Sequence, residues 1–206
     1  MLSSPEIAGR VVKKILCALW LRVTNETTMD FKQVDALASQ EPPLPYLVIG
    51  GYAVVAHGFV RTTVDIDLLI CREDREEWES RTAKAGLSIF HQTNAFIQLG
   101  CEDDQIGLDL MIVGKSTFDP MYQESQPNTI EDVSVRVPCL DHLLALKLHA
   151  AKNAKGLRIS KDLQDIEMLA RKNQLALNNE HYRALFNKYG TEDIYQVVIR
   201  SLNNEQ

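Results

Sequence analysis

The sequence contains few cysteines and no long hydrophobic segment. Its four cysteines lie far apart with apolar neighbours, at Cys17, Cys71, Cys101 and Cys139. Their pattern includes no CxxC motif, and we predict reduced, buried thiols with no cysteine–histidine metal site. No apolar run approaches the ~20 residues of a membrane-spanning helix, and no basic segment introduces one at the N-terminus. The sequence therefore predicts a cytoplasmic protein that is neither secreted nor inserted in a membrane.

A strong excess of one charge is also missing, but the charges are unevenly placed. The formal net charge of the 206 residues is −6, with 45% hydrophobic and 24% charged residues, which is typical of a soluble chain with one sizeable core. Between His142 and Lys172, seven lysines and arginines stand against three acids. This basic strip could receive the phosphates of a nucleotide or of RNA, and a solvated helical face is the alternative.

The hydrophobic pattern predicts an α+β fold with a mixed sheet, followed by a helical C-terminal part. We expect strands at residues 46–49, 64–70, 87–91, 95–100, 106–113 and 133–137, all in one sheet. We expect helices at residues 7–21, 52–57, 72–85, 142–155, 161–173, 178–188 and 191–202. Trp78 is the expected inward anchor of its helix, and Asp141 and Thr191 are expected helix caps. We place the core with its N-terminal helix at residues 1–137 and a helical subdomain at residues 138–206.

Two aspartates stand two positions apart in an otherwise apolar segment. Asp65 and Asp67 lie among the aliphatic residues of positions 64–70, a pattern that indicates a buried strand with both carboxylates on one face. Like charges so close together oppose burial, whereas a divalent cation accepts oxygen ligands from both. The pair therefore predicts a metal site, and acids of a turn or a helix cap are the alternative.

A third acid, Asp109, interrupts the apolar strand expected at residues 106–113. If this strand lies beside the one carrying Asp65 and Asp67, the three carboxylates could hold two divalent ions and orient an attacking hydroxyl. Otherwise Asp109 faces solvent on an edge strand, while its neighbours Leu108 and Leu110 point inward.

A glycine pair, Gly50 and Gly51, lies where the first expected strand gives way to a helix. Glycines let phosphate oxygens approach backbone N–H groups at the positive end of a helix, although such a pair often only eases a tight bend. Arg61 follows at short range and could contact a phosphate or pair with an acid such as Asp67. Lys147 is flanked by leucines and is either a functional lysine or one on the wet flank of a packed helix.

The pattern hGG…RxTxDhD, followed by a strand with one more aspartate, resembles the minimal nucleotidyltransferases of the DNA polymerase β superfamily. It is most similar to the AbiEii-like toxins of type IV toxin–antitoxin systems, with lincosamide and aminoglycoside nucleotidyltransferases as related groups. Those toxins also carry a downstream lysine in one helix, then a basic residue and two acids near the start of another. LKLHA at 146–150 and KDLQDI at 161–166 are similar here. The resemblance covers roughly residues 46–169.

The resemblance implies a minimal nucleotidyltransferase fold with a metal-dependent active site. Asp65, Asp67 and Asp109 would hold Mg²⁺, two ions in all, and all three would be catalytic. Asp109 would also activate the acceptor, and Lys147 would neutralise phosphate charge as transfer proceeds.

The resemblance also implies a nucleotide-binding site formed by Gly50, Gly51, Arg61, Lys147 and Asp165. Many superfamily members have Gly-Ser where this chain has two glycines, so a serine hydroxyl at the phosphates is missing. Either Asp162 or Asp165 could match the acid of the family's second helix, and we favour Asp165.

The function expected from these residues is Mg²⁺-dependent transfer of a nucleoside monophosphate from an NTP to a hydroxyl, with pyrophosphate as the leaving group. The acceptor stays open between RNA, as in toxins that extend tRNA ends, a small molecule, as in antibiotic-modifying relatives, and a protein. A toxin role would imply a cognate antitoxin as a partner. The alternative from another class is a catalytically silent module that binds a nucleotide or a partner.

Overall fold

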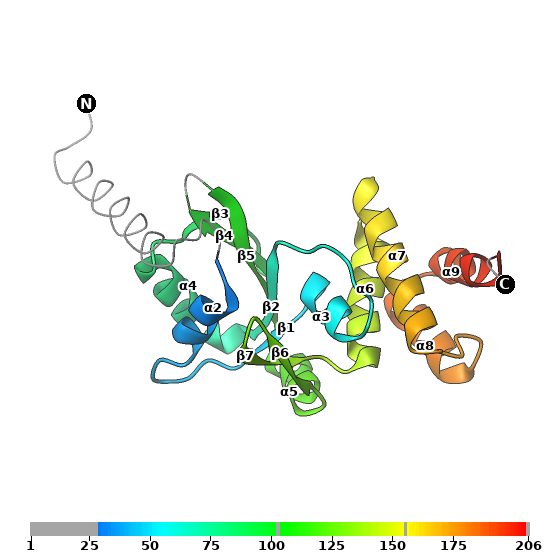
Figure 1. The fold of residues 1–206 in the computed structure, drawn as a ribbon, viewed down its shortest axis with the longest axis horizontal. Helices are drawn as coiled ribbons and strands as arrows, with labels where there is room; N and C mark the ends of the chain where they lie inside the picture. The colour runs from blue at the N-terminus through cyan, green and yellow to red at the C-terminus, as the bar shows by residue number, and fades with distance from the viewer. Residues whose placement is uncertain (1–28, 102–103, 155, 205–206) are drawn as a thin grey trace.

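A five-stranded sheet with the spatial strand order β1–β2–β5–β4–β3 forms the centre of the fold. The computed structural model describes residues 29–101, 104–154 and 156–204. The strands are β1 (Tyr46–Val48), β2 (Ile66–Cys71), β3 (Ser88–Gln92), β4 (Phe96–Cys101) and β5 (Asp104–Val113). β2 and β5 are parallel and the other neighbours are antiparallel, which confirms the predicted mixed sheet (Figure 1).

Side chains of the two central strands alternate between two apolar layers. The main core takes Ile66, Leu68, Ile70, Leu108, Leu110 and Ile112. On the other face, Leu69 belongs to a second cluster with Phe118 and Met121 of α5 (Lys115–Gln123). Because side chains along a strand alternate with a period of two, Asp67 and Asp109 lie on the same face as Leu69.

Helices and a small second sheet surround the main sheet. The helices of this half are α2 (Phe31–Ala38), α3 (Gly50–Ala56), the 3-10 helix η1 (Arg72–Asp74), α4 (Arg75–Lys84) and α5. The second sheet pairs β6 (Gln126–Ile130) with β7 (Val133–Val137). The expected strand at 133–137 therefore exists, but the expectation that it extends the main sheet is wrong. Its partner β6 was not predicted, because Pro127 and the polar residues of this strand do not form a strand-like pattern. The helix α5 was not predicted either, because it contains Pro120.

The C-terminal helices lie beyond α3, on its side away from the strands (Figure 1). They are α6 (Leu140–Asn153), α7 (Leu157–Lys172), α8 (Glu180–Tyr189) and α9 (Glu192–Asn204). The Thr191 hydroxyl accepts a hydrogen bond from the Ile194 N–H at 3.3 Å, which confirms this cap. Asp141 is not a cap, because the N-cap residue of α6 is Cys139. The Asp141 Oδ2 atom instead lies 2.7 Å from the His181 Nε2 atom. The helix expected at 7–21 lies outside the described residues, and the division at residue 137 stays a prediction.

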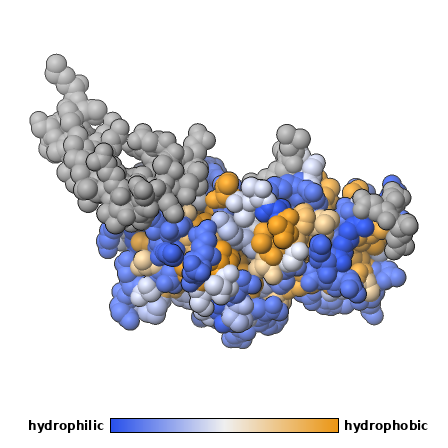
Figure 2. Space-filling view, in the orientation of Figure 1, coloured by the Kyte–Doolittle hydropathy of each residue, from blue (hydrophilic) through white to orange (hydrophobic). Residues whose placement is uncertain are grey.

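The surface is mostly hydrophilic on the face shown in Figure 2, with apolar residues in a few patches near the middle. The largest exposed apolar side chains of the described residues include Val60 and Val64, both in the loop before β2. None of the described helices is both long and apolar enough to cross a membrane.

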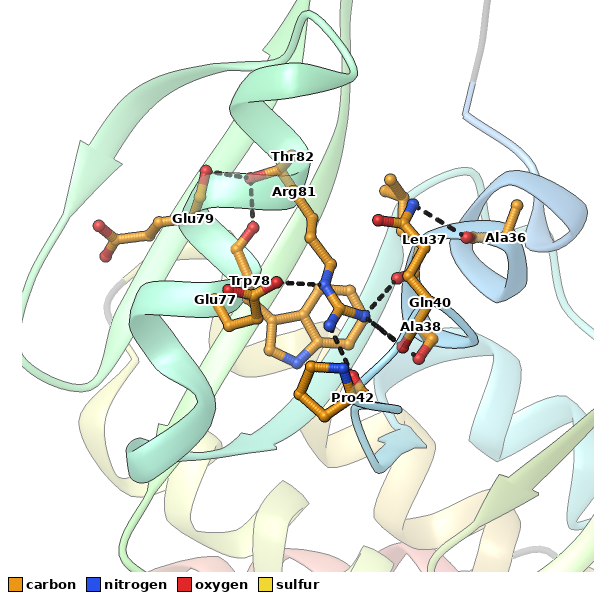
Figure 3. Close-up of polar contacts among 10 residues, drawn as sticks. All are labelled: Ala36, Leu37, Ala38, Gln40, Pro42, Glu77, Trp78, Glu79, Arg81 and Thr82. Atoms are coloured by element: carbon orange, nitrogen blue, oxygen red, sulfur yellow. Dashed lines mark hydrogen bonds and ion pairs between the residues drawn. The ribbon is translucent and has the colours of Figure 1, made fainter.

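A buried arginine ties the chain ahead of β1 to α4 (Figure 3). Arg81 is 1% exposed, and its guanidinium donates to the backbone carbonyls of Leu37 at 2.9 Å, of Gln40 at 3.1 Å and of Pro42. Its Nε donates to the Glu77 carboxylate at 2.7 Å. We call this group the Arg81 cluster. A buried cation is tolerated only when its donors are paired, so the cluster fixes the segment that leads into β1 and the glycine pair.

Candidate active site

Asp67 and Asp109 lie side by side on the two parallel strands at the centre of the sheet. Their Cα atoms are register partners in the β2–β5 ladder. β5 lies between β2 and β4, so the alternative that Asp109 stands on an edge strand is wrong. Gln98 of β4 donates to the Asp109 carboxylate at 3.4 Å. Asp65 precedes the first residue of β2 and is exposed.

The Asp67 carboxylate lies against the start of α3. The backbone N–H of Gly51 is close enough to lower the pKa of this carboxylate. A Cβ atom on Gly50 would overlap this carboxylate, and Gly50 has a φ of +60°. Only glycine meets both conditions without strain. The absence of a side chain at Gly50 lets the Asp67 carboxylate of β2 approach the backbone. The sequence did not indicate this structural role of the glycine pair.

Asp67 is surrounded by charges of both signs. Burial raises the pKa of Asp67, and the charge of Asp65 raises it further, while Lys147, the Gly51 N–H and Lys161 lower it. Repulsion between neighbouring carboxylates is relieved by a divalent ion, and oxygen donors suit a hard ion such as Mg²⁺. The donor type, though not yet the distances, is therefore the one that the resemblance implies. Within the described part of the chain, the oxygens of Asp65, Asp67 and Asp109 do not all lie within 4.8 Å of one another.

Gly51 packs against the loop that leads into β2. A Cβ atom on Gly51 would overlap the Thr63 hydroxyl and would lie 3.1 Å from an Arg61 guanidinium nitrogen. The structure thus brings a hydroxyl to the glycine pair from another part of the chain. Sequence reasoning gave Thr63 no role, although it is the threonine of the RxTxDhD pattern and that position could have suggested one.

Four charged side chains from the same loop, α6 and α7 form a buried group, which we call the Lys147 cluster. The Lys147 Nζ lies 3.0 Å from Asp162 Oδ1 and 2.7 Å from Asp165 Oδ2. The Arg61 Nε lies 2.8 Å from Asp165 Oδ1, and its Nη2 donates to Asp165 Oδ2 at 3.1 Å. Arg61 therefore pairs with Asp165 and not with Asp67. Both Asp162 and Asp165 contact Lys147. The contacts therefore do not single out one of them as the match for the acid of the family's second helix.

The basic strip expected between His142 and Lys172 is only partly a surface feature. Lys147 is 8% exposed and belongs to the buried cluster, together with two of the three acids of that window. Lys152, Lys161 and Lys172 remain exposed. Of these, Lys161 is close enough to the site to act on the charge of Asp67.

Cys139 lies closer to a histidine than the sequence analysis indicated. Cys71 is buried, as expected, and its thiol donates to Glu73 at 2.8 Å. Cys139 is half-buried at the start of α6, where ligand atoms of Glu124, Cys139 and His142 all lie within 4.8 Å of one another. Cys139 and His142 are three positions apart, a spacing that brings two side chains to one side of a helical turn.

The solved structures with a similar fold include two that contain an antibiotic or its adenylyl derivative. One is ANT(2'')-Ia in complex with adenylyl-2''-tobramycin, with 18% identity, a TM-score of 0.50, and coverage of 84% of this chain and 95% of that one. Another is the lincosamide antibiotic adenylyltransferase LnuA bound to lincomycin, with 16% identity, a TM-score of 0.50, and coverage of 70% of this chain and 98% of that one. At these identities the likeness concerns the fold alone. No curated protein matches the chain.

A family model identifies the chain as a nucleotidyltransferase, which is an enzyme. The family model described as "Nucleotidyl transferase AbiEii toxin, Type IV TA system" matches residues 36–206. The chain belongs to this family, which confirms the resemblance found in the sequence.

Proposed function

We propose that the protein transfers a nucleoside monophosphate from an NTP to an acceptor hydroxyl, with Mg²⁺ bound by Asp65, Asp67 and Asp109. The observation that carries the proposal is the register pairing of Asp67 with Asp109, with the Lys147 cluster close enough to act on Asp67. Two such ions, when bound, would neutralise phosphate oxygens and lower the pKa of the attacking hydroxyl.

In the transfer step, the acceptor oxygen attacks the α-phosphorus of the NTP. The bond from that phosphorus to the oxygen bridging the β-phosphate breaks, and pyrophosphate leaves. The Asp109 carboxylate takes the proton from the acceptor, since it lies beside Asp67 and is held by Gln98. The protein thus contributes alignment and charge, with no covalent intermediate on a side chain.

The triphosphate would be bound by side chains that now bind each other. Lys147 is buried and acts on the charge of Asp67, Arg61 is half-buried beside Gly51, and each is paired with acids of α7. Cations already desolvated at the site need little reorganisation when phosphate oxygens arrive. The Thr63 hydroxyl, packed against Gly51, would supply the phosphate contact that a serine makes in Gly-Ser relatives.

For the acceptor, RNA is the first candidate and an antibiotic-like small molecule is the second. Exposed Lys152 and Lys161, which follow Lys147 along α6 and α7, favour a phosphate-rich acceptor. The family's description also suggests a toxin role for this chain. In that role, its protein partner would be an antitoxin and it would act in the cytoplasm.

Incubation with α-labelled NTPs, Mg²⁺ and total RNA tests the proposal, with lincomycin and tobramycin as parallel acceptors. We expect label on RNA, and a loss of at least about 100-fold in Asp67→Asn. The matched control is Asp119→Asn, because Asp119 is an exposed aspartate that pairs with Lys115 at 3.0 Å on α5. Label on a drug alone would move the acceptor to the second candidate.

Two outcomes contradict the enzyme assignment or its site. NTP binding without transfer to any acceptor would support the silent module. Transfer that survives in Asp67→Asn at the wild-type rate would reject the site. For the toxin role, expression of the wild type should arrest growth and expression of Asp67→Asn should not, whereas harmless expression of the wild type would count against it.

A further inference from the structure

Three side chains of metal-ligating type converge where α5 ends and α6 begins. Glu124 is the residue that ends α5, Cys139 is the residue from which α6 starts, and His142 lies in the first turn of α6. One ligand atom of each lies within 4.8 Å of the other two. The His142 Nε2 is 3.9 Å from Glu124 Oε2. No part of this group belongs to the aspartate site.

The distances are close to those of a coordinated ion. In a tetrahedral zinc site, with bonds of about 2.0–2.3 Å, neighbouring ligand atoms lie about 3.3–3.8 Å apart. Small rotamer changes of Glu124 and Cys139, which are exposed and half-buried, would close the remaining gap. The Cys-x-x-His spacing in one helical turn keeps two of the ligands at a fixed separation.

The donor set selects the type of metal. A thiolate, an imidazole and a carboxylate suit a borderline or soft ion such as Zn²⁺, whereas Mg²⁺ prefers oxygen donors. The buried Nδ1 of His142 has no hydrogen-bond partner among the described residues, so no hydrogen bond at this nitrogen fixes the ring. A ligand on the ring would fix its orientation and tautomer.

We propose that Glu124, Cys139 and His142 bind one Zn²⁺ ion per chain, with the fourth position open to water. Binding displaces the thiol proton of Cys139 to solvent and forms a zinc–thiolate bond. The ion would join the end of α5, which packs on the sheet, to the start of α6, which carries Lys147. The site is independent of the function proposed above, since no aspartate of the sheet contributes to it.

Cobalt titration of the full-length, chelator-treated protein tests the site through the thiolate-to-cobalt absorption of Co²⁺. We expect one Co²⁺ per chain with this absorption, and its displacement by an equivalent of Zn²⁺. Cys139→Ser and His142→Ala should each abolish the absorption. The matched control is Cys71→Ser, because the Cys71 thiol also has a carboxylate partner, Glu73, but no histidine, so its loss should change nothing.

The other outcomes reject the site. Absorption that persists in Cys139→Ser would assign the bound ion to another thiol, and cobalt binding without thiolate absorption would assign it to carboxylates. Circular dichroism of each variant without metal shows whether the fold is kept. If His142→Ala unfolds, Glu124→Gln replaces it, with at least a 10-fold weaker Co²⁺ affinity expected and an unchanged affinity contradicting the proposal. Asp67→Asn should leave the absorption intact, so failure of this site and failure of the transferase site are distinguishable.

Discussion

The Arg81 cluster and the Lys147 cluster bury cations in different ways. Arg81 donates mainly to neutral backbone carbonyls, with one carboxylate, Glu77, at the partly exposed end. Arg61 and Lys147 instead contact two buried carboxylates, and Asp162 Oδ2 is buried without a hydrogen-bond partner among the described residues. The donors of Arg81 are thus satisfied mainly by the backbone, whereas Arg61 and Lys147 are satisfied by negatively charged side chains.

From this difference we infer a structural role for the Arg81 cluster and propose a functional one for the Lys147 cluster. Backbone carbonyls are fixed by the chain, so Arg81 has nothing to exchange for a ligand. A lysine between two carboxylates can turn to a phosphate because one charged partner replaces another, and Asp165 then keeps its pair with Arg61. We therefore expect changes in the Arg81 cluster to alter stability and changes in the Lys147 cluster to alter transfer.

The largest effect should follow the loss of Lys147. Lys147→Met leaves Asp162 without its cation, which should lower the free energy of unfolding by roughly 3–5 kcal/mol. The rate of nucleotidyl transfer should fall at least about 100-fold. The double variant Lys147→Met with Asp162→Asn removes both charges, so stability should largely return while transfer does not. Chemical denaturation and label transfer measure the two effects, and recovery of both would make the cluster structural.

Arg81→Met should be nearly as costly to the fold, because it leaves three carbonyls and their loop without a donor. We expect a loss of about 3–4 kcal/mol in unfolding free energy, with specific activity of the folded protein unchanged. Arg75→Met is the control, since Arg75 forms the same i,i+4 pair with Glu79 at 2.7 Å on the same helix but is partly exposed. Its loss should stay below about 1 kcal/mol. Equal losses of unfolding free energy in Arg81→Met and Arg75→Met would show that the backbone contacts of Arg81 add nothing to stability.

Two glycines with positive φ extend the comparison to the backbone. Gly50→Ala adds a clash with the Asp67 carboxylate to the strain of its φ, whereas Gly58, at φ +95°, has open space around its Cβ position. Gly58→Ala should cost about 1–2 kcal/mol of stability and little activity, and Gly50→Ala should also reduce transfer at least about 10-fold. Similar transfer rates in both variants would show that the position of Asp67 does not depend on Gly50.

The smallest effect is expected from Thr63→Val, which keeps the shape of the side chain and removes its hydroxyl. A phosphate contact of this kind is worth about 1–1.5 kcal/mol, so the KM for the NTP should rise roughly 5- to 10-fold with thermal stability nearly unchanged. An unchanged KM would limit Thr63 to packing against Gly51.

The sequence predicted the face on which Asp67 lies, but it wrongly placed Asp65 in the same buried strand, since Asp65 precedes β2 and is exposed. Alternation of apolar residues around Asp67 and Asp109 places both on one face, and parallel pairing of their strands then brings them into register. Most helices of the C-terminal part followed from their period, although Asp141 was misread as a cap because the helix begins one residue after Cys139.

The remaining features depend on contacts between distant parts of the chain. The pairing of Arg61 with Asp165 spans 104 positions, and the packing of Thr63 on Gly51 depends on a loop without regular structure. No periodic pattern encodes either contact. The strand at 133–137 has a clear pattern, but its partner β6 does not, so the sequence could not place it in a second sheet.

The most direct measurement is calorimetric titration of a non-hydrolysable NTP with Mg²⁺ into the wild type, the Lys147→Met/Asp162→Asn variant and the Arg75→Met control. If the Lys147 cluster receives the triphosphate, the double variant should bind at least about 10-fold more weakly, and the control should bind as the wild type does. Equal affinity in a folded double variant would contradict the account, because the buried lysine would then serve the fold alone.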